Sequence, residues 1–341
     1  MTDEHFEKWI TNGSVPLFKS VSELVLSYLL VILVGEDFYK RHGAELIPRM
    51  AQFERDLQHP ILRLVPDSLW GLTRPGAAIL NTRARFNELI AVELKDILAD
   101  PEKHKDRGDY FYYVTTQCGD EHAPAYGSHI MSLVFGGHAN AAMTVPWMLL
   151  HARRAPGALE RLREEALEPE DVRKPYLEAC LRETGRLYTN TQMLRMTKES
   201  VNIAGHVLPP RTLVACSPLA TQRENGVESI GIYEDASHWN PDRFTEDPNA
   251  YPNWFQRAEF VQFGIGIHAC PGEKLARLLI FDLMLKGWAE KFDFDVVSGL
   301  EEGKKGIDGV GAEAAWTEEN FGTPSVRGGD VIISVRKRAL A

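Results

Sequence analysis

Cys270 is the residue of this chain whose surroundings are best suited to chemistry. It lies in the segment FGIGIHACPG, residues 263–272. The glycines in this segment let the backbone turn tightly and approach a flat object closely. Residues 273–288 have the pattern of a helix, and a thiolate just before a helix is stabilised by unpaired amide N–H groups and the positive end of the dipole. The segment therefore predicts a cysteine that is kept deprotonated as a metal ligand.

A lone cysteine in a glycine-rich turn is more often an ordinary loop residue, so the whole pattern has to support the prediction. The segment resembles the haem-binding loop of cytochromes P450, which has Phe, two residues, Gly, three residues, Cys, one residue and Gly. Phe263, Gly266, Cys270 and Gly272 fill those four positions. The resemblance implies a haem b cofactor in contact with Phe263, with its iron bound by the Cys270 thiolate.

Two other segments gain meaning beside this loop. Alone, Glu183 and Arg186 are a pair on one helix face, which is worth little on a surface, and WNPDRF, residues 239–244, is an Asn-Pro turn. In this order they resemble the Glu-x-x-Arg helix and the Pro-x-Arg-Phe segment of the same family. The resemblance implies that Glu183, Arg186 and Arg243 form one buried ionic cluster behind the haem, which fixes the cysteine loop.

Two positions resemble family residues that bind the haem propionates. Arg195 begins the first strand predicted after the Glu-x-x-Arg helix, and a guanidinium fork suits a carboxylate. His268 stands two residues before Cys270, where the family often has Arg or His. The alternatives remain open: Arg195 as a surface charge on an edge strand, and His268 as a histidine that packs on its own turn.

The segment GGHANA, residues 136–141, departs most from the family that the chain resembles. Typical monooxygenases have an acid followed by Thr here, and this pair organises water and delivers protons. Ala139 and Asn140 take the two places, and neither has a useful acidity. Asn140 can still donate a hydrogen bond or hold a water, which makes it the candidate catalytic residue. His138 could relay protons if it faces the site, but in this register we expect it to face away.

Composition excludes several other functions. The chain has 341 residues, 44% hydrophobic and 25% charged, which is typical of a soluble globular protein. Its net charge of −10 argues against nucleic-acid binding. The four cysteines are scattered and predict no disulfide scaffold or zinc ribbon. The N-terminus is polar, and the apolar run 24–34 is shorter than a membrane span. We therefore expect a core helix there and no transmembrane segment. The resemblance implies a location in the cytoplasm or on the cytoplasmic face of the endoplasmic reticulum, with peripheral membrane contact possible.

The pattern predicts a mainly α fold with a minor β-sheet, and the resemblance implies one P450-like domain over residues 1–341. Helices are expected at 20–34, 44–57, 78–98, 125–154, 156–165, 175–187 and 273–288. The helix expected at 175–187 is followed by short alternating runs at 194–197, 201–203, 207–208 and 212–216, which predict the strands of one small sheet. A further strand is expected at 331–335. Gly136, Gly137 and Pro146 predict a distortion of the central helix.

The resemblance implies a haem-thiolate monooxygenase that oxidises a small apolar substrate of secondary or lipid metabolism with dioxygen. Electrons would come from an external NADPH-dependent reductase, because no dinucleotide fingerprint is present. Family members are longer, so an N-terminally truncated P450 fold without the front helices and membrane anchor is expected. Two alternatives stay open: rearrangement or dehydration of a peroxide without dioxygen, and an inactive truncated family member.

Overall fold

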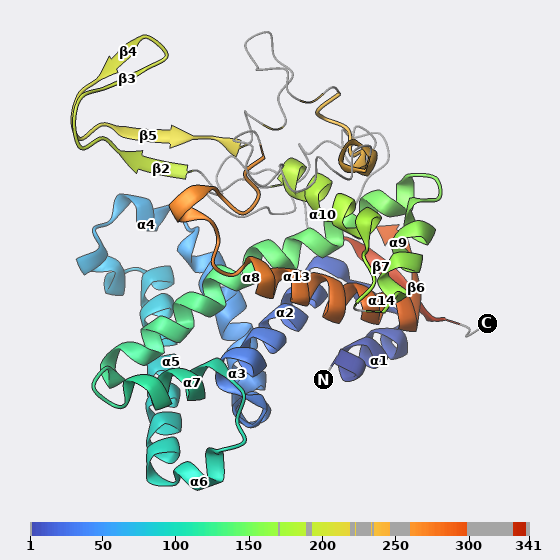
Figure 1. The fold of residues 1–341 in the computed structure, drawn as a ribbon. Coiled ribbons are helices and arrows are strands. Elements are labelled where there is room, and N and C mark those ends of the chain that lie inside the picture. Colours follow the sequence, from blue (N-terminus) through green and yellow to red (C-terminus); the bar gives the residue numbers. More distant parts are fainter. Residues whose placement is uncertain are drawn as a thin grey trace. The chain divides into compact units, whose positions relative to one another are not determined.

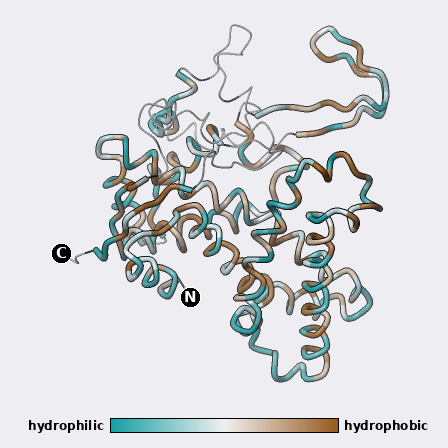
Figure 2. Tube along the Cα trace, turned by 180° about the vertical axis from the view of Figure 1, so that it is seen from behind, coloured by the Kyte–Doolittle hydropathy of each residue, from teal (hydrophilic) through white to brown (hydrophobic). Residues whose placement is uncertain are grey.

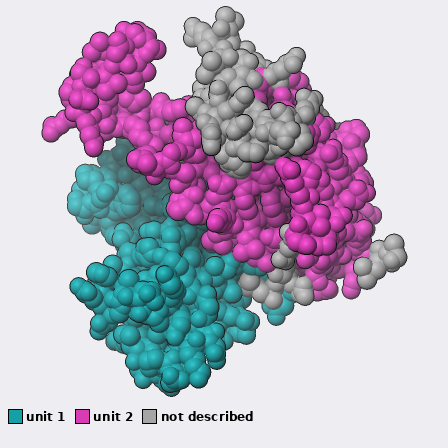
Figure 3. Space-filling view, in the orientation of Figure 1, with its two compact units in different colours: residues 1–5, 16–142 teal, residues 6–15, 143–341 magenta. Residues whose placement is uncertain are grey.

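The computed structural model describes residues 2–169, 171–188, 193–218, 222, 233, 235–245, 260–298 and 330–338. The chain divides into two compact units (Figure 3). Unit 1 comprises residues 1–5 and 16–142, and unit 2 comprises residues 6–15 and 143–341. Units of this kind can belong to one domain, so a single domain over residues 1–341 stays a prediction.

Unit 1 is built on the apolar helix α2 (Leu17–Val34), which packs against α3 (Glu36–Leu57) and α7 (Tyr110–Cys118), while α3 packs on α5 (Arg74–Ala99). Leu and Val residues cover nearly the whole circumference of α2, and most of them are buried. By length and composition α2 is the one helix among the described residues that could cross a membrane, but 72% of its apolar window is buried inside the protein. Such burial fits the core helix that the sequence predicts.

Side-chain caps define where the helices α5 and α7 of unit 1 begin. Thr73 accepts from the Gly76 amide before α5, and Asp109 accepts from the Tyr112 amide before α7. The remaining elements of this unit are short, apart from the first part of α8, which continues into unit 2. They are α4 (Ile61–Leu64), η1 (Asp67–Leu72), α6 (Pro101–His104) and α8 (Ala123–Arg154).

A buried ionic network joins α2, α5 and the loop before α7 in unit 1. The Arg107 guanidinium donates to Glu93 Oε1 at 2.6 Å, to Asp109 Oδ2 at 2.7 Å and to the Val34 carbonyl at 2.5 Å. The side chains of Glu93 and Asp109 are only 2% and 5% exposed. Arg41 gives Glu93 a second partner at 2.6 Å. Each buried carboxylate is therefore paired, as burial of a charge requires.

Unit 2 gathers short helices around α10 (Pro175–Tyr188), which carries buried side chains on every face. A second helical region follows the cysteine loop, in which α13 and α14 are joined by the π-helical turn η4 (Figure 1). Among the described residues, the helical elements of this unit besides α8 and α10 are most of α1 (Thr2–Asn12), α9 (Ala158–Leu167), η2 (Pro241–Phe244), η3 (Gly266–His268), α13 (Glu273–Leu278), η4 (Leu279–Leu285) and α14 (Lys286–Lys291).

The strands in the described part of the chain form three small sheets. One has the order β1-β7-β6 and contains β1 (Ser14–Pro16), β6 (Phe292–Ser298) and β7 (Ile332–Lys337), with Phe294 opposite Val335. The other two are antiparallel pairs, β2 (Met193–Met196) with β5 (Leu213–Cys216) and β3 (Val201–Ile203) with β4 (His206–Leu208). These four strands form an arm that ends in the β3–β4 hairpin (Figure 1), and hydrophobic stretches lie along it (Figure 2).

The mainly α fold with minor sheets is confirmed, but several details differ from the sequence prediction. The strands at 193–216 form two separate pairs rather than one sheet. The second predicted helix begins at Glu36 instead of residue 44, because the polar first turns give no apolar periodicity. The prediction missed α1, α7 and β6. The helix α8 runs from 123 to 154 with Pro146 inside it.

Candidate functional site

The cysteine loop of unit 2, residues 260–272, is closed by its own backbone. The Cys270 amide donates to the Phe263 carbonyl at 2.6 Å, and the Gly264 amide donates to the Val261 carbonyl at 3.0 Å. Gly264 has φ 73°, and a Cβ there would stand 2.8 Å from the His268 carbonyl oxygen. Only glycine, which has no Cβ, allows this close turn. The tight backbone turn agrees with the sequence prediction. The closed loop presents Cys270 as an exposed free thiol.

The donor set around Cys270 fits a metal that brings most of its own ligands. Among the described residues, no group of three or more His, Cys, Asp or Glu side chains could hold a metal ion. One exposed thiol is therefore a poor site for a bare ion such as zinc, which takes four ligands. It suits an iron that is already held in the plane of a macrocycle and needs one axial thiolate. The residues present fit haem in this respect.

Behind the loop, the Arg186 guanidinium is fully buried and fully hydrogen-bonded. Two of its N–H groups donate to the Glu183 carboxylate at 2.7 and 2.8 Å. The other three donate to backbone carbonyls of Gln222, Ala236 and His238, at 2.6, 2.7 and 3.2 Å. All five donors of the guanidinium are thus used. The side chain has no group left to bind a substrate.

Glu183 is the centre of this cluster and is equally buried. Its Oε1 also accepts from the Asn240 amide at 2.8 Å and from Arg243 Nε at 3.1 Å. Arg243 in turn donates to the carbonyls of Asp235 and His238. The structure therefore brings Glu183, Arg186 and Arg243 together. Removal of one partner would strand buried charge at a cost of about 3–5 kcal/mol.

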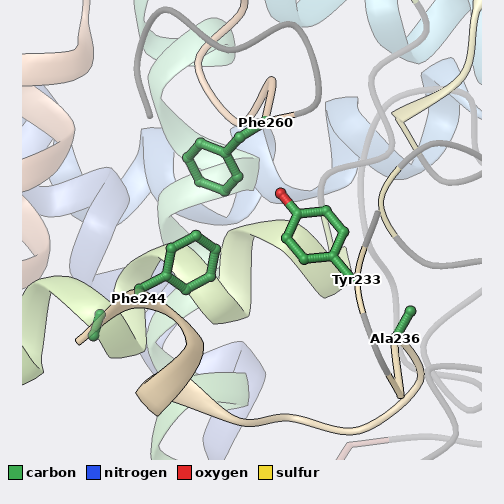
Figure 4. Close-up of a cluster of buried hydrophobic side chains, with 5 residues drawn as sticks. Tyr233, Ala236, Phe244 and Phe260 are labelled. Atoms are coloured by element: carbon green, nitrogen blue, oxygen red, sulfur yellow. The ribbon is translucent and has the colours of Figure 1, made fainter. Parts of the chain in front are cut away.

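A small apolar cluster packs beside these charges. It combines residues of α10, of the segment before η2, of η2 itself and of the start of the cysteine loop, and its members are Ala179, Tyr233, Ala236, Phe244 and Phe260. The rings of Phe244 and Phe260 lie 5.4 Å apart (Figure 4). The Arg186 guanidinium lies 5.1 Å from the centre of the Tyr233 ring. The cluster keeps water away from the ion pairs, which strengthens them.

The cysteine loop and the helix after it are tied to α10 at two further points. Gln262 donates to the Leu181 carbonyl at 3.3 Å, and its amide fills the space where a Cβ of Gly185 would stand. Arg277, on α13, pairs with Glu178 of α10, and its guanidinium lies 5.6 Å from the centre of the Phe263 ring. Gly185 is therefore needed for close packing, which the sequence motif alone did not indicate.

The other predicted site residues are exposed. Arg195 lies on β2, and its guanidinium donates to the Leu194 carbonyl at 2.7 Å. His268 ends the short helix η3 beside Cys270, and both side chains reach solvent. Asn140 lies on an exposed side of α8 in unit 1, together with Gly136 one turn earlier. The binding roles of Arg195 and His268 and the catalytic role of Asn140 stay predictions.

His138 is fixed in the interior of unit 1, facing away from the Asn140 side of α8. Its Nδ1 lies 2.5 Å from Glu54 Oε1 on α3, and its Nε2 lies 2.9 Å from Ser22 Oγ on α2. Residues two apart on a helix point about 200° apart. His138 therefore joins three helices of unit 1, and we assign it no proton relay.

A second buried histidine lies at the unit 2 end of α8. His151 Nε2 lies 2.7 Å from the Tyr188 hydroxyl, and its ring stacks on Trp239 at a centroid distance of 5.4 Å. The Tyr188 ring stacks in turn on Trp147 at 4.7 Å. Complete burial lowers the pKa of His151 to about 3, and the nearby cations Arg154 and Arg186 act in the same direction. His151 is thus a neutral member of the core at any ordinary pH.

Sequence reasoning missed the residues whose contact partners lie far away along the chain. Gln262 contacts Leu181, which lies 81 positions earlier in the chain, and Arg277 contacts Glu178, 99 positions earlier. No spacing rule connects either pair. The only available signal was local: Glu178 and Arg182, like Glu273 and Arg277, stand four residues apart in the order that favours pairing on a helix. That signal predicts a surface pair rather than a link between two helices.

Comparison with known proteins agrees with this geometry. The family model described as Cytochrome P450 matches residues 18–307. The cytochrome P450 monooxygenase pyvB of Aspergillus violaceofuscus is 32% identical over 283 residues, which cover 81% of this chain and 56% of that protein. The cytochrome P450 monooxygenase pytD of Aspergillus terreus is 27% identical over 86% of this chain and 80% of its own length. Lanosterol 14-alpha demethylase of Bos taurus is 24% identical over 87% of this chain and 60% of its own length.

The fold comparison finds a solved structure with a similar fold. The retinoic acid bound cyanobacterial CYP120A1 superposes with a TM-score of 0.74 and 17% identity, covering 99% of this chain and 72% of that one. At this identity the likeness concerns the fold alone. The chain spans little more than half the length of the pyvB protein. The family match, by contrast, extends over most of this sequence and includes the cysteine loop. The chain belongs to the cytochrome P450 family.

Proposed function

We propose that the chain is a haem-thiolate monooxygenase that oxidises a small apolar substrate of secondary or lipid metabolism. The observation that carries the proposal is Cys270, an exposed free thiol on a closed loop that is tied to a buried ionic cluster. When bound there, haem supplies the iron centre at which dioxygen is activated. The names of the two Aspergillus relatives, both cytochrome P450 monooxygenases, support this reaction class.

The chain's own residues have separate tasks in this proposal. The Cys270 thiolate would bind the haem iron through its sulfur and supply electron density to it. The cluster of Glu183, Arg186 and Arg243 holds the loop so that the sulfur keeps its position. Arg195 and His268 would bind the two propionates, since both side chains are exposed and can donate hydrogen bonds to carboxylates.

Asn140 would act as a hydrogen-bonding residue rather than as an acid. Its Nδ2 can donate and its Oδ1 can accept, so the side chain can hold one water in a fixed orientation. An amide gives up no proton at ordinary pH, and protons must then come from that water. Slow proton delivery is the expected cost of having Asn140 where related enzymes have an alcohol.

Electrons would reach the protein from a separate NADPH-dependent reductase. We propose a location in the cytoplasm or at the cytoplasmic face of the endoplasmic reticulum, where peripheral contact with the membrane is possible. The apolar substrate class follows from the reaction, because insertion of oxygen into a C–H bond can modify molecules that have few polar groups. The name of the bovine relative, a lanosterol demethylase, is consistent with such a substrate.

The reduced-CO absorption spectrum of the full chain tests the proposal. We expect the band typical of thiolate-ligated haem in the wild type and its loss in Cys270→Ala. Cys216→Ala is the matched control, because Cys216 is also an exposed free cysteine of unit 2 but lies on β5. An identical spectrum in Cys270→Ala and the wild type would rule out Cys270 as the ligand, and absence of any haem band in the wild type would favour an inactive family member.

A second candidate function is favoured by one observation, the absence of the acid and alcohol at Ala139 and Asn140. Haem chemistry that rearranges or dehydrates a peroxide needs no delivery of protons to dioxygen. Turnover of a lipid hydroperoxide without reductase and without dioxygen would establish this reaction. A strict requirement for both would exclude it.

A further inference from the structure

Gln222 is a fully buried amide that joins the ionic cluster to the cysteine loop. Its side chain is 0% exposed. Its Oε1 accepts from the Val261 amide at 2.8 Å, and its Nε2 donates to the Arg186 carbonyl at 3.4 Å. Its own backbone carbonyl accepts from Arg186 Nη1 at 2.6 Å. One residue therefore contacts Arg186 twice and the start of the loop once.

The hydrogen bond from the Val261 amide to Gln222 fixes the backbone near the start of the cysteine loop. The Val261 carbonyl accepts from the Gly264 amide, and the Phe263 carbonyl accepts from the Cys270 amide. Displacement of Val261 would move the residues whose carbonyls close the loop around Cys270. Val261 is 4% exposed, so water has little access to replace a lost acceptor. An unpaired buried amide at this point is costly.

We propose that Gln222 is a positioning residue for the Cys270 thiolate and transmits the fixed geometry of Arg186 to the cysteine loop. The inference rests on the proposed function and deepens it. A glutamine suits this task because one side-chain amide offers an acceptor and a donor at the same time. An apolar side chain of equal length would fill the same space but would leave the Val261 amide without an acceptor.

Hydrogen exchange of the unmutated full chain gives the first test. The Val261 amide must be protected as strongly as the Asn240 amide, which is bound to Glu183 inside the same cluster. Residue-resolved exchange measures both in one experiment and needs no haem. Exchange of Val261 at the rate of an exposed amide would overturn the proposal, whether or not any variant folds.

Gln222→Met provides the second test, because methionine has a similar length and lacks the acceptor. We expect exchange at Val261 to become roughly five- to tenfold faster, the factor typical of one lost hydrogen bond. Gln262→Met is the matched control: it removes the bond to the Leu181 carbonyl one residue along the loop and leaves the Gln222–Val261 bond intact. Equal acceleration in both variants would show general loosening and would contradict a specific role.

The haem-loaded chain adds a spectroscopic signature that a purely structural role would not change. In Gln222→Met, the reduced-CO spectrum should show a larger fraction of haem that has lost its thiolate ligand than in the wild type. The spectra are recorded at a temperature at which circular dichroism shows an intact fold. An unchanged fraction would overturn the positioning role. A wild type without any thiolate band would instead refute the proposed function, while the exchange result at Val261 would stand.

Discussion

His151 should make the stability of this protein depend on pH in a defined window. The residue is buried, and its pKa falls from 6.5 to about 3 in the folded chain. Below pH 6.5 the unfolded chain therefore binds a proton that the folded chain does not bind. The stabilisation is complete above pH 6.5 and is lost progressively as the pH falls towards 3.

The size of the effect follows from the two pKa values. Each pH unit inside the window is worth about 1.4 kcal/mol of unfolding free energy. Between pH 7 and pH 5 the loss from His151 alone is about 2 kcal/mol, because most of this interval lies below the pKa of the unfolded chain. This is a sizeable part of the total stability of a typical domain.

The perturbation is His151→Gln, which keeps a polar partner for the Tyr188 hydroxyl and cannot titrate. Urea unfolding followed by tryptophan fluorescence at pH 7 and pH 5 gives four free energies of unfolding. All other titrating groups act alike in both chains, so their effects cancel in the double difference. We expect the variant to lose about 2 kcal/mol less than the wild type on acidification. Equal losses in the two chains would refute the neutral, buried state of His151.

Three further predictions concern stability. Arg107→Met strands the buried carboxylates of Glu93 and Asp109 and should lower the free energy of unfolding by about 3–5 kcal/mol in urea melts; a change below 1 kcal/mol would contradict the network. Gly185→Ala drives a Cβ into the Gln262 amide and should cost about 1–3 kcal/mol, whereas Gly136→Ala, with open space around it, should be neutral or slightly stabilising. Glu54→Gln removes the charged partner of His138 and should cost about 1–3 kcal/mol, measured by thermal melts; an unchanged melting temperature would show that the contact contributes nothing.

Local patterns predicted the helices well where one face is apolar. The helices α5, α8 and α10 and the short strands of the arm follow directly from periodicity and from Gly and Pro punctuation. The helix α7 was missed because its aromatic residues give no clear stripe over nine positions. The strand β6 was missed because its partner β7 is about 40 residues further along the chain.

The candidate site was predictable as far as its motifs reach. Cys270 and the three charged residues of the cluster could be named, because their residue types and spacing resemble a family pattern. Gln222 and Arg277 could not be named, since each acts through a partner far away in the sequence. The direction of His138 depends on the rotation of α8 about its axis, which packing against α2 and α3 determines.

The contacts of α10 make the spacing along this helix as important as its residue types. Between Glu178 and Arg186, side chains and carbonyls of α10 contact Arg277 on α13, the cysteine loop itself and the ionic cluster. Insertion of one residue in this stretch would rotate everything beyond it by about 100° and shift it by 1.5 Å. A point change on α10 affects the contacts of one residue, whereas a change of length between these positions would displace several contacts at once. Length variation among relatives should be confined to the segments outside this stretch.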